Sequence, residues 1–166
     1  GEMRKHIEET GRAFEKFGLN PMQGRIMAYL INCERPEATF MEMVRYFGAS
    51  KSSISTALNY LLSSGIIDYT RNLPDRKKYF FITEIFFSQY FEQLLKNIKD
   101  LKVLCYKTIS TRSDKDKFLN EKLHRWLKGS SIFEESISHL LVQNNALKKK
   151  SFIKLFHKNS SVYSQK

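Results

Sequence analysis

The apolar residues between positions 39 and 62 repeat with the period of two short helices separated by a tight turn. The first helix has four apolar residues at i, i+3, i+4 and i+7 spacing: Phe40, Met43, Val44 and Phe47. The second helix has a similar buried stripe: Ile54, Ala57, Leu58, Leu61 and Leu62. Gly48 lies between the two helices and readily takes the left-handed conformation that ends a helix. The pattern therefore predicts a helix-turn-helix.

Capping residues mark where these helices start. Thr39 and Glu42 have the T-x-x-E spacing of a capping box, in which each side chain binds the backbone N–H of the other residue. Ser50 is the expected N-cap of the second helix, because its hydroxyl can accept from a free N–H of the first turn. Further upstream, Asn20 and Gln23 have the same reciprocal spacing and predict another helix start.

Two segments after Gly65 have the composition of strands. Residues 66–70 and 79–83 are rich in β-branched and aromatic residues, and Pro74 and Asp75 between them favour a turn. The connection carries four cations: Arg71, Arg76, Lys77 and Lys78. Residues 20–83 thus predict a winged helix-turn-helix DNA-binding domain, in which the hairpin is the wing and the helix after Ser50 enters the major groove.

The exposed face of that helix carries short hydrogen-bonding side chains, one cation and no acid. A helix exposed only for solubility usually carries Glu and Lys, so this composition favours contact with base edges and phosphates. The predicted DNA-binding residues are Ser50, Lys51, Ser52, Ser53, Ser55, Thr56 and Asn59 on the helix, and Arg71, Arg76, Lys77 and Lys78 on the wing. The alternative is a solvated helix beside a charged hairpin that serves solubility.

Long helices are expected on both sides of this domain. Residues 1–19 predict an N-terminal helix, and residues 84–109 have a near-heptad apolar stripe. A polar break over 110–116 precedes another helical pattern, in which Gly129 either separates two helices or kinks one. Ser131 and Glu134 have the spacing of a second capping box. The fold class is therefore mainly α with a small β-hairpin wing, flanked by N- and C-terminal helices.

The C-terminal region, residues 84–166, has more apolar residues than one small winged domain can cover. A two-fold dimer built from residues 1–19 and 84–166 would bury them, whereas the alternative is a helical subdomain within one chain. From Lys148 onward the chain has six lysines and no acids. We expect this basic tail to pack on the partner subunit, with DNA and an acidic membrane surface as the alternatives.

Charge does not single out the predicted DNA-binding half. The net charge of the chain is +11, but residues 1–83 account for +3 and residues 84–166 for +8. This balance favours a polyanionic partner without identifying it. The apolar runs are far shorter than the ~20 residues that span a bilayer, and the first residues lack the apolar core of a signal peptide. We therefore expect a cytoplasmic protein.

Several sequence segments resemble the MarR-type bacterial transcriptional regulators. The segments are GASKSSIS, LLSSGIIDY and PDRKKYFFIT, and the upstream GRAFEKFGLNPMQGRIMAYL is similar to the GbsR branch of that superfamily. The resemblance covers residues 8–84 and implies a homodimer that binds operator DNA. It places Asp75 and Arg76 in the wing, with Arg76 reaching the minor groove. It also places Ser52, Ser53, Ser55 and Thr56 on the side of the helix that faces DNA.

The resemblance further implies regulation by a small molecule that binds between the DNA-binding and dimerisation parts. The candidate effector-binding residues are aromatic: Tyr29, Tyr46, Phe86, Tyr90 and Trp126. Because GbsR-type proteins are associated with choline and glycine betaine, an aromatic cage for a quaternary ammonium group is one possibility. The alternative is that these rings are core residues.

No motif of an enzyme, a cofactor site or a metal site is found in the sequence. Phosphate-binding loops, dinucleotide-binding loops, H-E-x-x-H and paired-cysteine motifs are all missing. The histidines are scattered, and a metal site from His124 and His139 is the weaker alternative. Cys33 and Cys105 are expected to be reduced, with oxidant sensing as their alternative. The rival to a DNA-binding regulator is a winged-helix module that docks an acidic protein without sequence-specific DNA binding.

Overall fold

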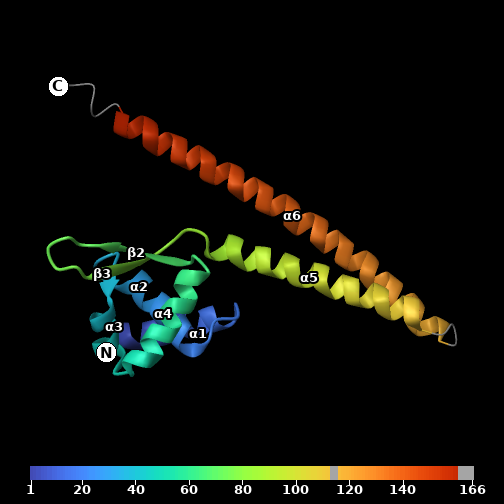
Figure 1. The fold of residues 1–166 in the computed structure, drawn as a ribbon, viewed down its shortest axis with the longest axis horizontal. Coiled ribbons are helices and arrows are strands. Elements are labelled where there is room, and N and C mark those ends of the chain that lie inside the picture. The colour runs from blue at the N-terminus through green and yellow to red at the C-terminus, as the bar shows by residue number, and fades with distance from the viewer. Residues whose placement is uncertain (113–115, 161–166) are drawn as a thin grey trace. The chain divides into compact units, whose positions relative to one another are not determined.

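The computed structural model describes residues 1–112 and 116–160, and side chains up to residue 146. It divides into two compact units, one from Gly1 to Gln89 and one that begins at Tyr90. The elements, coloured along the chain in Figure 1, are α1 (Glu2–Glu15), α2 (Pro21–Asn32), β1 (Ala38–Thr39), α3 (Phe40–Phe47), α4 (Lys51–Ser63), β2 (Ile67–Arg71), β3 (Lys78–Ile82), α5 (Phe86–Thr111) and α6 (Lys117–Ser160).

Reciprocal caps start α2 and α3, as predicted. The Gln23 backbone N–H donates to Asn20 Oδ1 and the Asn20 N–H donates to Gln23 Oε1, both at 2.9 Å. At α3, the Thr39 N–H donates to Glu42 Oε2 at 2.6 Å and the Glu42 N–H donates to Thr39 Oγ1 at 3.3 Å. Gly48 follows α3 with φ of 57°, the left-handed conformation expected of it. These local contacts fix the starts of α2 and α3, and Gly48 begins the turn to α4.

The first unit closes around one hydrophobic core. Its buried members come from the helices, the sheet and the connections: Leu19, Ile26, Met27, Leu30, Ala38, Met43, Ile54, Ala57, Leu58, Leu61, Ile66, Ile67 and Phe80. The predicted stripe of α4 is confirmed, except that Leu62 is only half-buried. Because α4 buries this stripe, its opposite face is left to solvent.

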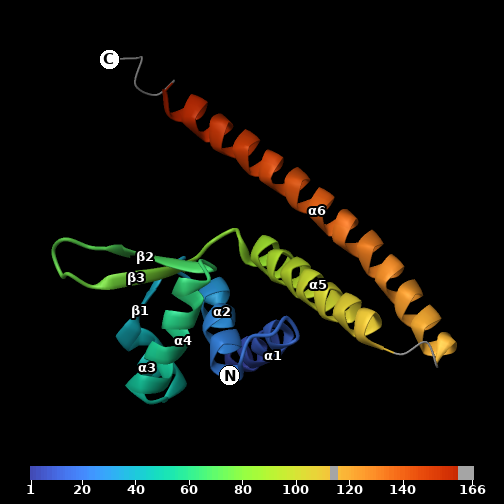
Figure 2. The ribbon, with the colours of Figure 1, turned by 45° about the vertical axis from the view of Figure 1, so that its right-hand side comes forward.

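The sheet has three strands in the order β1-β3-β2, one more than the sequence predicted. The added strand pairs Ala38 with Phe80 and Thr39 with Tyr79, antiparallel to β3. β2 pairs with the other edge of β3. The β2–β3 hairpin extends beyond the helices of the first unit in both ribbon views (Figures 1 and 2). The inner strand of the wing is thereby fixed along both edges at its base.

α1 packs closely on α2 through two glycines. A Cβ atom on Gly24 would lie 2.5 Å from the carbonyl oxygen of Gly11, so only glycine allows this helix crossing. Arg25 Nε also donates to Glu8 Oε2 at 2.9 Å. At the start of α1, the Arg4 guanidinium donates to the Tyr46 carbonyl oxygen at 2.6 Å. α1 is therefore part of the first unit, whereas its predicted dimerisation role stays a prediction.

The second unit is a hairpin of α5 and α6, and it corrects two expectations about α6. The helix continues through Gly129, so the alternative in which Gly129 separates two helices is wrong. The predicted Ser131–Glu134 capping box is also wrong. Ser131 Oγ donates to the Leu127 carbonyl at 3.0 Å, and Lys102 Nζ of α5 donates to Ser131 Oγ and Glu134 Oε2 at 2.9 and 2.8 Å. A serine inside a helix commonly binds the carbonyl four residues earlier.

The second unit buries few of its side chains within one chain. Between residues 90 and 146, leaving aside 113–115, only Leu127 and Ile137 are buried. Several large apolar side chains in that range are more than half exposed: Val103, Leu104, Tyr106, Phe118, Trp126, Ile132, Phe133, Leu140 and Val142. Within the described residues, no helix is long and apolar enough to span a membrane. The predicted packing of the basic tail falls outside the described side chains.

Candidate nucleic-acid interface

α4 presents the predicted DNA-binding residues on one solvent-facing side. Ser50 caps the helix by accepting from the Ser53 N–H at 3.1 Å. The exposed members are Ser50, Lys51, Ser52, Thr56 and Asn59, and the half-buried members are Ser53 and Ser55. No acidic residue occurs in α4. The face therefore offers hydroxyl, amide and ammonium groups without a negative charge that would repel phosphate.

Residues 72–77, the wing loop, are held by hydrogen bonds to one carboxylate. Asp75 Oδ1 accepts from the Lys77 backbone N–H at 2.9 Å, and Asp75 Oδ2 accepts from the Tyr79 hydroxyl at 2.7 Å. The Lys77 N–H and then the Tyr79 hydroxyl hold the pKa of Asp75 below its usual value, and the same bond raises the pKa of Tyr79. The one acid of the loop is thus used internally and orders the segment that carries the cations.

The predicted cations of α4 and the wing have no salt-bridge partner among the described residues. Lys51 and the four wing cations, Arg71, Arg76, Lys77 and Lys78, are all exposed. Lys78 Nζ lies 4.4 Å from the centroid of the Tyr69 ring. Elsewhere in the same unit cations do pair with acids, as Arg25 does with Glu8. Unpaired cations gathered around an acid-free helix are suited to bind an anion.

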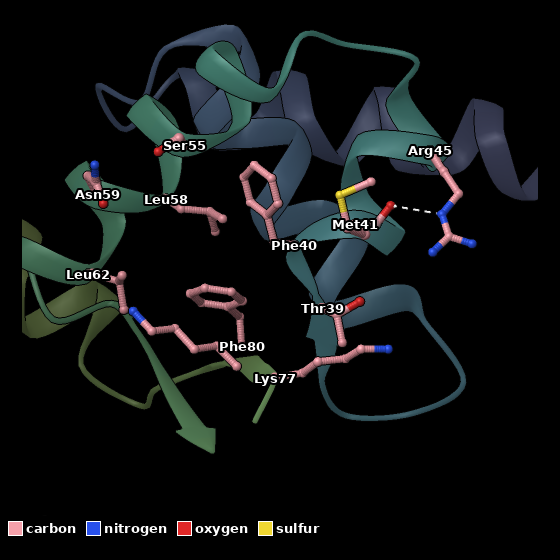
Figure 3. Close-up of a pocket in the computed structure, with 11 residues that line it drawn as sticks. Thr39, Phe40, Met41, Arg45, Ser55, Leu58, Asn59, Leu62, Lys77 and Phe80 are labelled. Carbon is pink, nitrogen blue, oxygen red and sulfur yellow. Dashed lines mark hydrogen bonds between the residues drawn. The ribbon is translucent and has the colours of Figure 1, made fainter. Parts of the chain in front are cut away.

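A cavity of about 430 Å³ lies between α3, α4 and β3. Figure 3 shows the Phe40 and Phe80 rings facing into it, with Ser55 and Asn59 on one side and Arg45 and Lys77 on the other. The floor is therefore apolar, and the rim combines side chains of α4 with cations of α3 and the wing. This groove joins the two predicted contact elements into one surface.

Arg45 belongs to that rim and was missed by the sequence predictions. It is exposed on α3, and its Nε donates to the Met41 carbonyl at 3.3 Å. The sequence could have indicated that Arg45 is exposed, because it follows Val44 and lies outside the buried stripe of α3. That spacing could place a cation on the surface, but only the fold places it opposite α4.

The candidate effector residues do not form one site in the first unit. The Tyr29 and Tyr46 rings lie 4.7 Å apart, and the Arg4 guanidinium lies 4.9 Å from the Tyr46 centroid. Burial raises the pKa of Tyr29. Phe86 is in a different cluster, with its ring 5.2 Å from that of Phe14. Within the first unit, Tyr29 and Tyr46 are therefore in contact, whereas Phe86 packs with Phe14.

The remaining two effector candidates lie in the second unit. Tyr90 contacts the neighbouring Phe91 ring at 5.5 Å, and Trp126 on α6 is 61% exposed. Trp126 also lines a small cavity of about 150 Å³ between α5 and α6, together with Leu127 and Cys105.

Cys33 is not placed as a reactive thiol. Its Sγ donates to the Arg35 carbonyl oxygen at 2.7 Å, and burial raises the pKa of the thiol. A redox-sensing cysteine needs the opposite shift, because the thiolate is the reactive form. Within the described part of the chain, no three His, Cys, Asp or Glu side chains are grouped so that they could hold a metal ion.

Part of the chain is similar to proteins of the MarR family. Residues 17–78 match the family model of the MarR family. The HTH-type transcriptional regulator MmpR5 of Mycobacterium tuberculosis is 28% identical over 79 residues, which are 48% of this chain and 48% of MmpR5. The matched segment thus spans about half the length of that relative. Residues 17–78, which match the family model, include the helix-turn-helix and most of the wing.

A solved structure has the same fold over most of the chain. The crystal structure of a transcriptional regulator aligns with a TM-score of 0.66 and 20% sequence identity, covering 88% of this chain and 99% of that one. The mainly helical winged-helix fold is thereby established. The narrower resemblance to the GbsR branch stays a prediction.

Proposed function

We propose that this chain is a transcriptional regulator that binds operator DNA as a homodimer. The observation that carries the proposal is the surface formed by α4 and the wing, where the cations have no salt-bridge partner among the residues that the structure describes and α4 has no acid. In the bound state, Ser53, Ser55 and Asn59 contact base edges in the major groove. Lys51 and Arg71 contact phosphates, and release of counterions provides much of the affinity.

The wing contributes from the adjacent minor groove. The loop is shaped by Asp75, which leaves the side chains of Arg76 and Lys77 exposed to DNA. Arg76 enters the minor groove, whose negative potential attracts arginine. Lys77 lies on the rim of the groove that also contains Asn59, so helix and wing act on neighbouring parts of one site.

The second unit supplies the homodimer. Its exposed apolar side chains, among them Ile132 and Phe133, would cost free energy in water at about 25 cal/mol per Å². A second copy of the chain is the partner that covers the same surface on both molecules. Two winged heads then contact half-sites about 34 Å apart on one side of the DNA.

A small molecule regulates binding under this proposal. The Arg4 guanidinium near the Tyr46 ring supports a cation-binding role for that ring, which contacts Tyr29. A quaternary ammonium ligand would use the same attraction to an aromatic face. It changes DNA affinity only as far as it binds the free and DNA-bound forms differently. A melting temperature unchanged by saturating choline would count against this ligand class.

The first test is selection of binding sites from random duplex DNA at about 150 mM salt, because nonspecific phosphate contacts weaken steeply with salt. A palindromic motif is the expected result. Weak binding that depends steeply on salt and selects no motif would contradict the proposal. Docking of an acidic protein would then be the better explanation of the basic surface.

The second test is the double variant Ser53→Glu, Arg76→Ala, which changes one residue on α4 and one on the wing. We expect at least a hundredfold loss of operator affinity, because each good contact is worth roughly 1–3 kcal/mol. The matched control is Arg12→Ala, Lys16→Ala, which removes the same net charge from α1 and its end. Operator affinity that survives the first variant would show that DNA binds elsewhere.

A further inference from the structure

Leu73 is the most exposed large apolar side chain of the described residues, with 91% of its surface accessible. It lies in the wing loop next to Pro74, and the neighbouring positions Arg71 and Arg76 are cationic. Single exposed apolar residues are common on protein surfaces. The β2–β3 hairpin extends beyond the helices of the first unit (Figure 2), and Leu73 lies in its loop between Arg71 and Arg76.

The loop that carries Leu73 is held in place from both ends. The Asn72 N–H donates to the Lys77 carbonyl at 3.2 Å, and the Arg76 N–H donates to the Asn72 carbonyl at 2.9 Å. Arg76 has φ of 55°, a left-handed conformation that residues other than glycine seldom adopt. Leu73 therefore projects from an ordered turn and not from a loose strand end. Its side chain adds no burial to the core, so the fold gives no reason for leucine here.

We infer that Leu73 is an apolar wedge that inserts between base pairs from the minor groove when the wing binds DNA. The inference rests on the proposed function, and it adds a residue that reads DNA shape. Arg71, Arg76 and Lys77 draw the loop toward the phosphates that border the groove. Proteins that bind the minor groove often insert leucine or proline between base steps and bend the duplex toward the major groove.

A wedge gives sequence preference without a hydrogen bond to a base. Pyrimidine–purine steps such as TA and CA unstack most easily, so they are the cheapest to open. We therefore expect such a step at the centre of the wing contact in each half-site. The distance between the wing and α4 sets how far this step lies from the bases that α4 contacts. The preferred step should therefore occur at one fixed position in each half-site.

The test compares wild-type protein with Leu73→Ala on the selected operator. DNA bending is measured by energy transfer between dyes on the two DNA ends, and unstacking by the fluorescence of 2-aminopurine at the expected step. We expect the variant to lose most of the bend and the 2-aminopurine signal, with affinity lower by about three- to tenfold. Leu73→Met should keep both signals, since it preserves apolar volume. Ile31→Ala, a change at an exposed apolar residue of α2, is the matched control.

The outcomes separate the wedge from the proposed function. Specific binding with an unbent, stacked site in the wild type, or equal bending by Leu73→Ala, would overturn the wedge alone. A wild-type protein that selects no operator would overturn both. A loss of bending in Leu73→Ala that Leu73→Met restores, with an unchanged melting temperature, would establish the wedge.

Discussion

The two units of this chain differ in how many of their apolar side chains they bury. Residues 1–89 contain fifteen of the buried apolar side chains, whereas the described part of residues 90–146 contains two, Leu127 and Ile137. The first unit closes its core with contacts between helices, sheet and connections. The second exposes apolar side chains along both of its helices. The first unit therefore covers its own core, whereas the exposed apolar side chains of the helical hairpin would be covered by the proposed dimer.

We expect the largest effect from substitutions in α6 that weaken the proposed dimer. The double variant Ile132→Glu, Phe133→Glu places charges on two exposed apolar positions of α6. Because a two-fold interface counts each lost side chain twice, the dimer should weaken by about 3–6 kcal/mol. Sedimentation equilibrium measures the dissociation constant. Leu73→Glu, an equally drastic change at an exposed residue of the first unit, should leave the dimer unchanged.

An intact dimer in the α6 variant would contradict the comparison. The apolar side chains of α6 would then be exposed for some other reason than pairing. Circular dichroism of both variants must first show that the helix content is retained.

Two glycine substitutions test how tightly the helices of each unit are packed. Gly24→Ala should destabilise the first unit by about 1–3 kcal/mol, because its Cβ would lie 2.5 Å from the backbone of Gly11. Gly129→Ala in α6 should instead stabilise by about 0.5–1 kcal/mol, since nothing lies within 4 Å of its Cβ and alanine favours helix. Urea unfolding measures both. Stabilisation by Gly24→Ala together with destabilisation by Gly129→Ala would contradict this account of how the two helices pack.

The helix starts could be predicted from sequence because their determinants are local. Thr39 and Glu42 are three residues apart, and the box they form needs no distant partner. The same reasoning failed at Ser131 and Glu134, which have the same spacing. There Lys102, about thirty residues earlier, binds both side chains while the helix simply continues. A pattern of four residues does not distinguish a helix start from a helix interior with a partner on another helix.

The strand β1 and the groove could not be predicted for a different reason. Ala38 and Thr39 form two residues of strand, too short to show alternation, and their partners Phe80 and Tyr79 are forty residues away. Arg45 reaches the groove only because α3, α4 and β3 converge. The predicted residues of α4 and the wing are exposed where the pattern placed them, except Ser53 and Ser55, which are half-buried. Their contact with DNA stays a prediction.

Acid titration of two carboxylates gives a smaller effect in each unit. The Thr39 N–H, and then Arg35, lower the pKa of Glu42, and a hydrogen bond from Lys102 lowers that of Glu134. A carboxylate whose pKa is lowered by folding stabilises the folded state fully at pH values above its unfolded pKa of about 4.3. This stabilisation is lost as the pH falls through the folded pKa. Glu42→Gln should therefore lower stability by at most about 1 kcal/mol at pH 7 and have no effect at the acidic end.

The matched variant in the second unit is Glu134→Gln, with the same direction of pH dependence. Melting curves followed by tryptophan fluorescence report on the second unit, because Trp126 is the single tryptophan of the chain, and circular dichroism reports on both units. Each variant should shift only the transition of its own unit. A shift of both transitions by either variant would show that the two units unfold together and would contradict the idea that they are stable independently.

The smallest expected effect concerns the wing. Tyr79→Phe removes only the hydroxyl that donates to Asp75 and keeps the ring. Since both groups are at the surface, the free energy of unfolding of the whole protein should hardly change. Amide exchange at Lys77, whose N–H binds the same carboxylate, should become faster. Unchanged exchange would mean that the loop is held by its backbone bonds alone.

Thr39 belongs to two elements at once, and this limits where the chain can change its length. It pairs with Tyr79 in the sheet and caps α3 through Glu42. An inserted residue between 38 and 42 would shift the strand by one position and turn the buried Ala38 outward, because successive strand residues face opposite sides. The preceding loop, residues 33–37, has no such double role. Insertions should be accepted there and rejected a few residues later.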